Sequence, residues 1–262
     1  MARPIWKGVI RFGGVRVPVG LYSAAVDRSV SFRLLHATDL VPVKQHMVHP
    51  ITGKIVPPDE IRRGYDLGDG RFVLLDDAEL SSLEPPASRD IEVSRFVEAP
   101  GVARQWFDRP YYLAPDGDPV GYRALAAAMH QAGSEGVAHW VMRKKAYNGA
   151  LRSDGERLML LTLRAAREVI PASALPAPGG RKLDDKEIAL ARQLVDALEG
   201  DFDPNAFRDE YRERVLELVK AKAEGAPVRS PKARRRRAEV PLARALEDSV
   251  QRVRKERTPR AA

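Results

Sequence analysis

The chain has 262 residues, of which 44% are hydrophobic and 31% charged, a composition typical of a folded protein with one large domain or two small ones. It contains no cysteine, which excludes disulfides, thiolate zinc sites and cysteine nucleophiles. No stretch approaches the roughly 18 consecutive apolar residues of a membrane span, and residues 1–7 lack the apolar core of a secretory signal. We therefore expect a cytoplasmic protein.

The net charge of +8 is concentrated at the C-terminal end of the chain. Residues 225–262 hold 12 of the 44 basic residues but only 4 of the 36 acidic ones, so residues 1–224 are neutral as a whole. A basic tail on a neutral body favours a polyanionic partner, most often nucleic acid. A solvated tail that only aids solubility is the simpler alternative.

The first hundred residues predict β-structure. Strand-like runs, most of them with alternating apolar residues, occupy 15–21, 30–34, 71–75 and 91–96. Asp76 and Asp77 then begin a short helix, because carboxylates are good caps of helix N-termini. Several short strands of this kind predict a barrel or a sandwich, since two strands alone are not stable.

The middle of the chain contains an alanine-rich helix and the clearest hairpin of the sequence. The helix is predicted at 121–131, and a strand-like run follows at 137–145. Extended runs at 150–153 and 157–163 then flank Asp154-Gly155. Asp-Gly between two extended runs is typical of a type I′ hairpin turn.

Amphipathic helices are predicted in the last third of the chain, after a connector rich in proline and glycine at 171–180. The helix at 184–198 has an apolar stripe of Ile188, Ala191, Val195 and Leu198. The helix at 204–223 has a stripe of Phe207, Tyr211, Val215 and Leu218. Beyond a linker-like, arginine-rich stretch, a further stripe consists of Leu242, Leu246, Val250 and Val253. A helix this short frays in water unless a partner covers its apolar face.

No arrangement of residues predicts catalysis. His46 and His49 lie three residues apart, but no third and fourth ligand follow at zinc-like spacing. Neither a phosphate-binding loop nor a nucleophile elbow is present. Acidic pairs such as Asp184-Asp185 lie at helix starts, where the helix dipole accounts for them. We therefore expect a binding protein without a metal or cofactor.

Several segments resemble the bacterial Ku family, in order and over about residues 3–224. They are Arg3-Pro4-Ile5-Trp6-Lys7-Gly8, Ser31-Phe32-Arg33-Leu34-Leu35-His36, Ile61-Arg62-Arg63-Gly64-Tyr65, Phe107-Asp108-Arg109-Pro110-Tyr111-Tyr112 and Gly200-Asp201-Phe202-Asp203-Pro204. The chain departs from the family at His46-Met47-Val48-His49, where many members have Cys-x-x-Cys. The metal-binding knuckle of those members is therefore not expected here.

The resemblance implies an α+β fold with a seven-stranded β-barrel core and an extended bridge arm. Barrel and arm would occupy residues 1–180, a helical pair 181–224, and a basic, largely disordered tail with a short amphipathic helix 225–262. Two subunits would form a homodimeric ring around duplex DNA. Such proteins bind double-stranded DNA ends in non-homologous end joining, recruit and stimulate an ATP-dependent DNA ligase (ligase D), and have no catalytic activity. A nucleoid-associated location follows.

Candidate binding residues follow from charge and from this resemblance. Strands that span a duplex about 20 Å wide need at least six residues at about 3.3 Å each, so we hypothesise that the hairpin 137–163 belongs to the bridge. An ordinary solvated hairpin is the alternative. The DNA contacts predicted in the bridge and core are Lys7, Arg11, Arg16, Lys44, Arg143, Lys144, Lys145 and Arg152. Those predicted in the tail are Lys232, Arg234, Arg235, Arg236 and Arg237. The stripe of Leu242, Leu246, Val250 and Val253 would dock on the ligase or on DNA.

Three other functions remain open at this point. An architectural protein that coats duplex DNA would bind closed circles as readily as linear fragments. A nuclease would depend on a divalent metal, and the sequence offers no carboxylate cluster for it. A protein of the membrane surface would use the arginine run to bind acidic lipids.

Overall fold

The computed structural model describes residues 3–177, 179–225 and 242–257. The chain forms two compact units, one made of residues 1–28 and 32–174 and the other of residues 29–31 and 175–262. Among the described residues, no helix combines the length and the apolar character that crossing a membrane would need.

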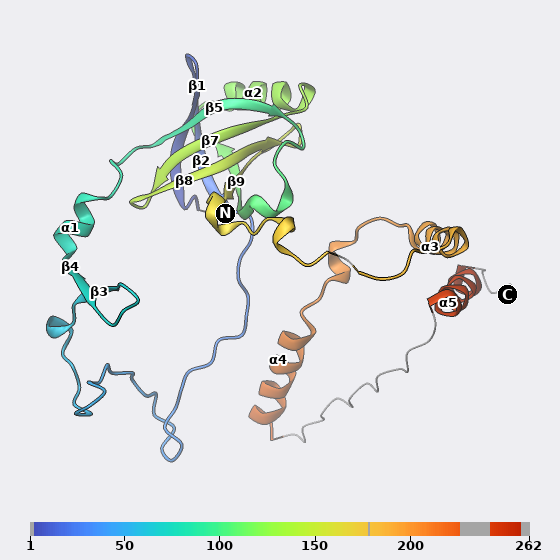
Figure 1. Cartoon of the computed structure of the whole chain (residues 1–262). Coiled ribbons are helices and arrows are strands. Elements are labelled where there is room, and N and C mark those ends of the chain that lie inside the picture. The colour runs from blue at the N-terminus through green and yellow to red at the C-terminus, as the bar shows by residue number, and fades with distance from the viewer. Residues whose placement is uncertain (1–2, 178, 226–241, 258–262) are drawn as a thin grey trace. The chain divides into compact units, whose positions relative to one another are not determined.

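The first unit contains a closed barrel of seven strands in the order β1-β2-β6-β9-β8-β7-β5 (Figure 1). The strands are β1 (Trp6–Phe12), β2 (Val15–Ser23), β5 (Asp90–Glu98), β6 (Phe107–Pro115), β7 (Ser134–Met142), β8 (Lys145–Ser153) and β9 (Leu158–Leu163). Neighbouring strands are antiparallel except β1 and β5, whose parallel pairing closes the barrel over three residue pairs. The predicted seven-stranded barrel and α+β class are confirmed.

The barrel core consists of alternate side chains from each strand. Ile10, Leu21, Ile91 and Leu160 are fully buried, and Trp140 is 1% exposed although it is the largest side chain there. Inward-facing residues alternate with outward-facing ones because successive side chains of a strand point to opposite faces. The alternation of apolar residues in the sequence therefore indicates which side chains face the interior of the barrel.

Helix α2 (Pro119–Gln131) packs against the barrel (Figure 1). It begins at Asp118, whose side chain accepts a hydrogen bond from the Gly121 amide. The Tyr122 hydroxyl donates to the Leu113 carbonyl at 2.7 Å and accepts from the Leu158 amide at 2.8 Å. This phenol joins strands β6 and β9 to the helix, and its burial raises the pKa of Tyr122.

The hairpin 137–163 is not an extended arm, so the hypothesis that it belongs to a bridge is wrong. Its strands β7, β8 and β9 lie side by side in the closed barrel. The physical reason is that inward-facing apolar residues alternate with outward-facing ones along these strands, which places Ala138, Leu151 and Leu158 in the core. Strands with a complete apolar face of this kind are stable inside the wall and not in solvent.

The turns of this hairpin also differ from the prediction. A type I′ turn needs two successive residues with positive φ, and between β8 and β9 only Gly155 has one, at 100°. The Asp154 carboxylate instead accepts hydrogen bonds from the Glu156 and Arg157 amides. The two-residue turn with positive φ at both positions joins β7 to β8 and consists of Arg143 (51°) and Lys144 (65°).

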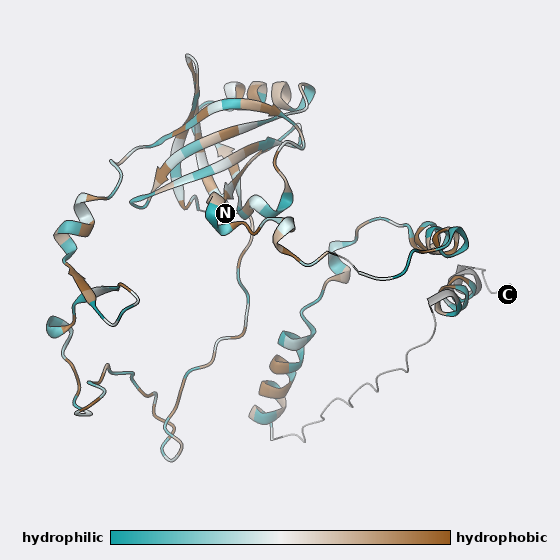
Figure 2. Cartoon of the chain, viewed as in Figure 1, coloured by the Kyte–Doolittle hydropathy of each residue, from teal (hydrophilic) through white to brown (hydrophobic). Residues whose placement is uncertain are grey.

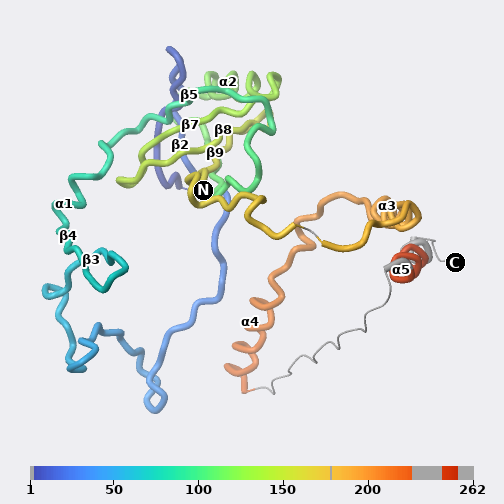
Figure 3. Tube along the Cα trace, viewed as in Figure 1, coloured from blue at the N-terminus to red at the C-terminus, as the bar shows by residue number. Residues whose placement is uncertain are grey.

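An extended segment, residues 24–89, leaves the barrel after β2 and returns to it at β5 (Figure 3), and all of it except residues 29–31 belongs to the first unit. This segment contains a two-stranded sheet of β3 (Arg63–Asp66) and β4 (Phe72–Leu75), and helix α1 (Asp77–Ser82). Asp76 caps α1 as predicted, in a capping box with Glu79. The strand predicted at 30–34 does not form, because no other strand pairs with it. No residue of the segment is buried.

Short 3-10 turns complete the first unit and the start of the second. They are η1 (Pro58–Glu60), η2 (Arg104–Trp106), η3 (Ala166–Glu168), η4 (Ala172–Ala174) and η5 (Pro204–Ala206).

The second unit contains helices α3 (Asp185–Leu198), α4 (Glu210–Ala223) and α5 (Leu242–Arg257), and α5 packs against α3. Asp184 and Glu187 form a capping box at the start of α3. The apolar stripe predicted for α3 is only partly correct. Ala191 is half-buried, whereas Ile188 and Val195 are exposed. The more protected side of α3 consists of Leu190, Ala191, Leu194 and Ala197.

Candidate nucleic-acid interface

Four of the eight basic residues predicted to contact DNA from the core already have a carboxylate partner. Lys7 Nζ lies 2.8 Å from Asp116 Oδ1, and Arg11 Nη1 lies 2.6 Å from Asp90 Oδ2. The hydrogen bond that Arg11 donates to the Asp90 carboxylate, and the negative charge of that carboxylate, raise the pKa of Arg11. A cation that is neutralised within the protein displaces fewer counterions from DNA, so these pairs weaken the case for Lys7 and Arg11.

Arg152 has an intramolecular role that competes with DNA binding. Its Nη2 lies 2.6 Å from Glu135 Oε1, and the Glu135 side chain is only 5% exposed. The same guanidinium stacks over the Phe107 ring, 4.5 Å from the ring centroid. A buried carboxylate needs a cation beside it, and Arg152 supplies one. Its predicted DNA contact stays a prediction.

Arg16, Lys44, Arg143 and Lys145 have no carboxylate partner among the described residues. Arg16 is exposed on β2, close to the β1–β2 turn, and Lys44 is exposed in the segment 24–89. The Lys145 ammonium lies 5.4 Å from the centroid of the Tyr147 ring, a cation–π contact that leaves its charge available. These four are the strongest candidates for phosphate contacts.

The β7–β8 turn gathers three of the predicted residues at one tip of the barrel. Arg143 and Lys144 form the turn itself, and Lys145 begins β8. Lys144 Nζ lies 3.0 Å from Glu84 Oε2, at the end of the segment 24–89. The turn therefore presents a dense positive charge next to the point where this segment returns to the barrel.

Comparison with known proteins agrees with this fold. A family model described as "Ku70/Ku80 beta-barrel domain" matches residues 11–190. The chain belongs to the Ku family. The matched region includes six complete strands of the barrel, part of β1, and the whole segment 24–89.

Curated relatives match nearly the whole chain. The Non-homologous end joining protein Ku 1 of Geotalea uraniireducens is 36% identical over 257 residues, which cover 97% of this chain and 98% of the relative. The Non-homologous end joining protein Ku of Anaeromyxobacter sp. is 37% identical, and the match covers 95% of this chain and 86% of the relative. The protein of the same name from Pseudomonas aeruginosa is 32% identical, and the match covers 85% of this chain and 78% of the relative. The match with the Geotalea uraniireducens protein covers 97% of this chain and therefore extends into both units.

The predicted tail contacts cannot be placed in the Ku fold. Lys232, Arg234, Arg235, Arg236 and Arg237 lie outside the described residues, as do the side chains of Leu242 and Val253. In α5, Leu246 is half-buried and Val250 is 6% exposed. Since α5 packs against α3, part of the stripe predicted to dock on the ligase or on DNA is buried within the chain.

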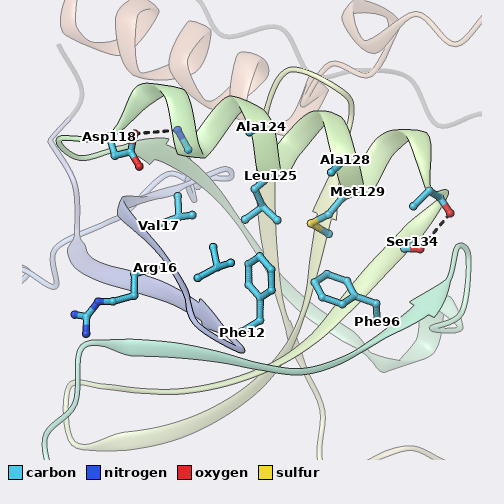
Figure 4. Close-up of a pocket in the computed structure, with 13 residues that line it drawn as sticks. Phe12, Arg16, Val17, Phe96, Asp118, Ala124, Leu125, Ala128, Met129 and Ser134 are labelled. Atoms are coloured by element: carbon cyan, nitrogen blue, oxygen red, sulfur yellow. Dashed lines mark hydrogen bonds between the residues drawn. The ribbon is translucent and has the colours of Figure 1, made fainter.

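An apolar cavity of the barrel unit lies between α2 and the β1–β2 hairpin (Figure 4). It has a volume of about 610 Å³, and the rings of Phe12 and Phe96 meet edge to face in its wall, with centroids 5.6 Å apart. Asp118, at its rim, caps α2. Within the residues that the structure describes, no three metal-binding side chains come together.

Sequence reasoning missed Arg89 as a candidate. This residue is exposed immediately before β5 and lines a cavity together with Arg143 and Lys144. The local sequence, Ser88-Arg89-Asp90, has no basic run to mark it. Only the pairing of β5 with β7 brings it next to the turn.

Proposed function

We propose that this member of the Ku family acts in non-homologous end joining. In this proposal a homodimeric ring binds double-stranded DNA ends regardless of their sequence, and a DNA ligase is recruited to it. The observation that carries the proposal is the family membership, together with relatives whose names state this process, one of which matches the chain over 98% of its own length. Binding rather than catalysis would be its role, with a nucleoid-associated location.

The segment 24–89 supports the dimer. It exposes 18 large hydrophobic side chains, among them Phe32 (66%), Phe72 (64%) and Leu74 (68%). The apolar face of β4 is visible in Figure 2. An isolated two-stranded sheet is marginal in water, and so large an apolar surface marks a protein contact. We take the segment 24–89 as the bridge arm, and a second copy of the chain would supply a partner surface for it.

A ring around DNA is also consistent with exposed cations that suit phosphate contacts. DNA breaks have no fixed sequence, so direct reading of bases would not help. Contacts to phosphate position a protein without specifying sequence, and exposed cations such as Arg16, Lys44, Arg143 and Lys145 suit them. Preference for ends would then come from topology, since a closed ring threads only onto a free end.

A gel-shift assay with a linear duplex and the same sequence as a closed circle, at about 150 mM salt, tests the proposal. The ring predicts binding to the linear duplex alone. Equal binding to both would overturn it in favour of an architectural protein that coats DNA. Sedimentation of the wild type and of Leu74→Asp tests the dimer, because a charge on the exposed apolar face of β4 should dissociate it.

Recruitment of the ligase needs a separate measurement. An ATP-dependent DNA ligase of the ligase D type should form a complex with the full chain on a linear duplex and join its ends faster. A chain that ends at residue 224 tests whether the basic tail and α5 contribute. If this truncated chain recruits the ligase and binds DNA with the same salt dependence, the tail and α5 have no part in either.

A further inference from the structure

A cationic pocket lies at one end of the barrel, with a volume of about 450 Å³. Its walls come from the start of β1, the residues before β5 and the β7–β8 turn. Three of its lining residues are the cations Arg89, Arg143 and Lys144. Trp6 and Ser88 add an aromatic wall and a hydroxyl group. We call it the Arg89 pocket.

The charge of the Arg89 pocket is only partly balanced within the chain. Among the described residues, Glu84 is the carboxylate paired with Lys144, at 3.0 Å, and neither Arg89 nor Arg143 has such a partner. Two guanidinium groups and an ammonium around one cavity suit an anion with several oxygen atoms. Guanidinium groups in particular bind phosphate through paired hydrogen bonds.

The backbone of the turn gives a second, independent indication. Arg143 and Lys144 both have positive φ, at 51° and 65°. Asn-Gly is the dipeptide that adopts such a turn with little strain, whereas residues with long side chains are strained there. The turn thus holds two long basic residues in a backbone conformation that disfavours long side chains. Strain of this kind is typical of functional positions.

We propose that the Arg89 pocket binds a phosphate group, which takes the place of the Glu84 carboxylate at Lys144. The inference rests on the proposed function in one respect, since the DNA backbone would be the main source of the phosphate. Free phosphate or a nucleotide presents the same oxyanion. Glu84 lies at the end of the bridge arm, so phosphate binding would release that end of the arm from the β7–β8 turn.

The variant Arg143→Asn/Lys144→Gly tests the pocket while favouring the fold. It removes two cations and installs the dipeptide preferred by the turn, so the Tm should rise by roughly 2–4 °C. Affinity for a linear duplex at about 150 mM salt should fall roughly 10- to 30-fold, and the salt slope should drop by about 1.8. The matched control, Arg104→Gln/Arg123→Gln, removes two exposed cations outside the pocket and should change the slope far less.

Glu84→Gln should act in the opposite direction. It removes the competing carboxylate from Lys144, so affinity for phosphate should increase several-fold. Glu156→Gln, in the β8–β9 turn, makes the same change of net charge away from the pocket and should leave affinity nearly unchanged. Opposite effects of changing the turn and of changing the carboxylate paired with Lys144 distinguish a site from a general effect of charge.

Calorimetric titration with inorganic pyrophosphate separates the two sources of phosphate. If the turn variant loses pyrophosphate binding but keeps the salt slope on DNA, the pocket takes a free phosphate. If the slope drops as well, the pocket takes the DNA backbone. The inference fails if the turn variant matches the Arg104/Arg123 control on both ligands. A wild type that binds closed circles would overturn the ring, but the pyrophosphate result would still decide on the pocket.

Discussion

Arg152 and Glu135 form an ion pair within the barrel wall, with Arg152 Nη2 2.6 Å from Glu135 Oε1. The carboxylate comes from β7 and the guanidinium from β8, and the Glu135 side chain is 5% exposed whereas that of Arg152 is 33% exposed. In a chain with 44 lysines and arginines, many basic residues could be taken as DNA contacts from the sequence. This pair shows that one of them already has a partner inside the protein, a carboxylate buried in the barrel wall.

We predict that Arg152→Ala lowers the free energy of unfolding of the barrel by about 2–4 kcal/mol, because it leaves a buried carboxylate unpaired. Because Arg152 is partly exposed, we expect a loss below the upper end of the range for fully buried ion pairs. Urea unfolding measures this loss. Arg157→Ala, at an exposed position of the next turn, is the control and should cost less than about 0.5 kcal/mol. The double variant Glu135→Leu/Arg152→Leu should recover most of the loss. Equal effects of Arg152→Ala and Arg157→Ala would contradict a structural role for the pair.

Tyr122→Phe should destabilise the barrel by about 1–3 kcal/mol, because it leaves the Leu158 amide and the Leu113 carbonyl without their buried partner. Burial raises the pKa of Tyr122 above its ordinary value of 10.0. The stability linked to the neutral phenol is therefore complete below about pH 10 and declines as the pH rises from there toward the folded pKa. Unfolding measured between about pH 8 and 11 should show this decline in the wild type and a smaller one in Tyr122→Phe. Parallel curves would show that the phenol is not responsible.

Lys7→Gln/Arg11→Gln should change the salt slope of DNA binding by less than about 0.5, because both cations are paired with carboxylates. Arg16→Gln/Lys145→Gln removes the same charge from cations that have no carboxylate partner in the described structure, and the slope should fall by up to about 1.8. Fluorescence anisotropy of a labelled linear duplex at several salt concentrations provides the comparison. If the two double variants behave alike, pairing within the protein does not select the DNA contacts.

Val250→Asp should separate α5 from α3, since Val250 is buried and a charged side chain there would have no partner. Limited proteolysis of the full chain should then cleave near the C-terminus many times faster, while the unfolding midpoint of the barrel unit stays the same. Asp248→Asn, on the exposed side of the same helix, serves as the control. Protection equal to the wild type in Val250→Asp would mean that α5 is not held through this residue.

Local patterns in the chain were enough to predict several of the helices and strands and to indicate the family. Apolar alternation is a local property of a strand, so β2 and β5 could be located without knowing their neighbours, whereas the same pattern at 30–34 does not correspond to a strand. The helices at 121–131 and 184–198 and the cap at Asp76 follow from local signals of the same kind. The family could be identified because its motifs are short runs that remain intact along the chain.

The three-dimensional fold was needed to show which cations lack a carboxylate partner and where the two-residue turn with positive φ lies. Lys7 and Asp116 are 109 residues apart, and Lys144 and Glu84 are 60 apart, so no local pattern links them. The β7–β8 register placed Arg143 and Lys144 in the two-residue turn, although Asp154-Gly155 had the stronger local signal. Register and barrel closure depend on how all seven inner faces fit together, and that cooperative packing is not encoded in any single segment.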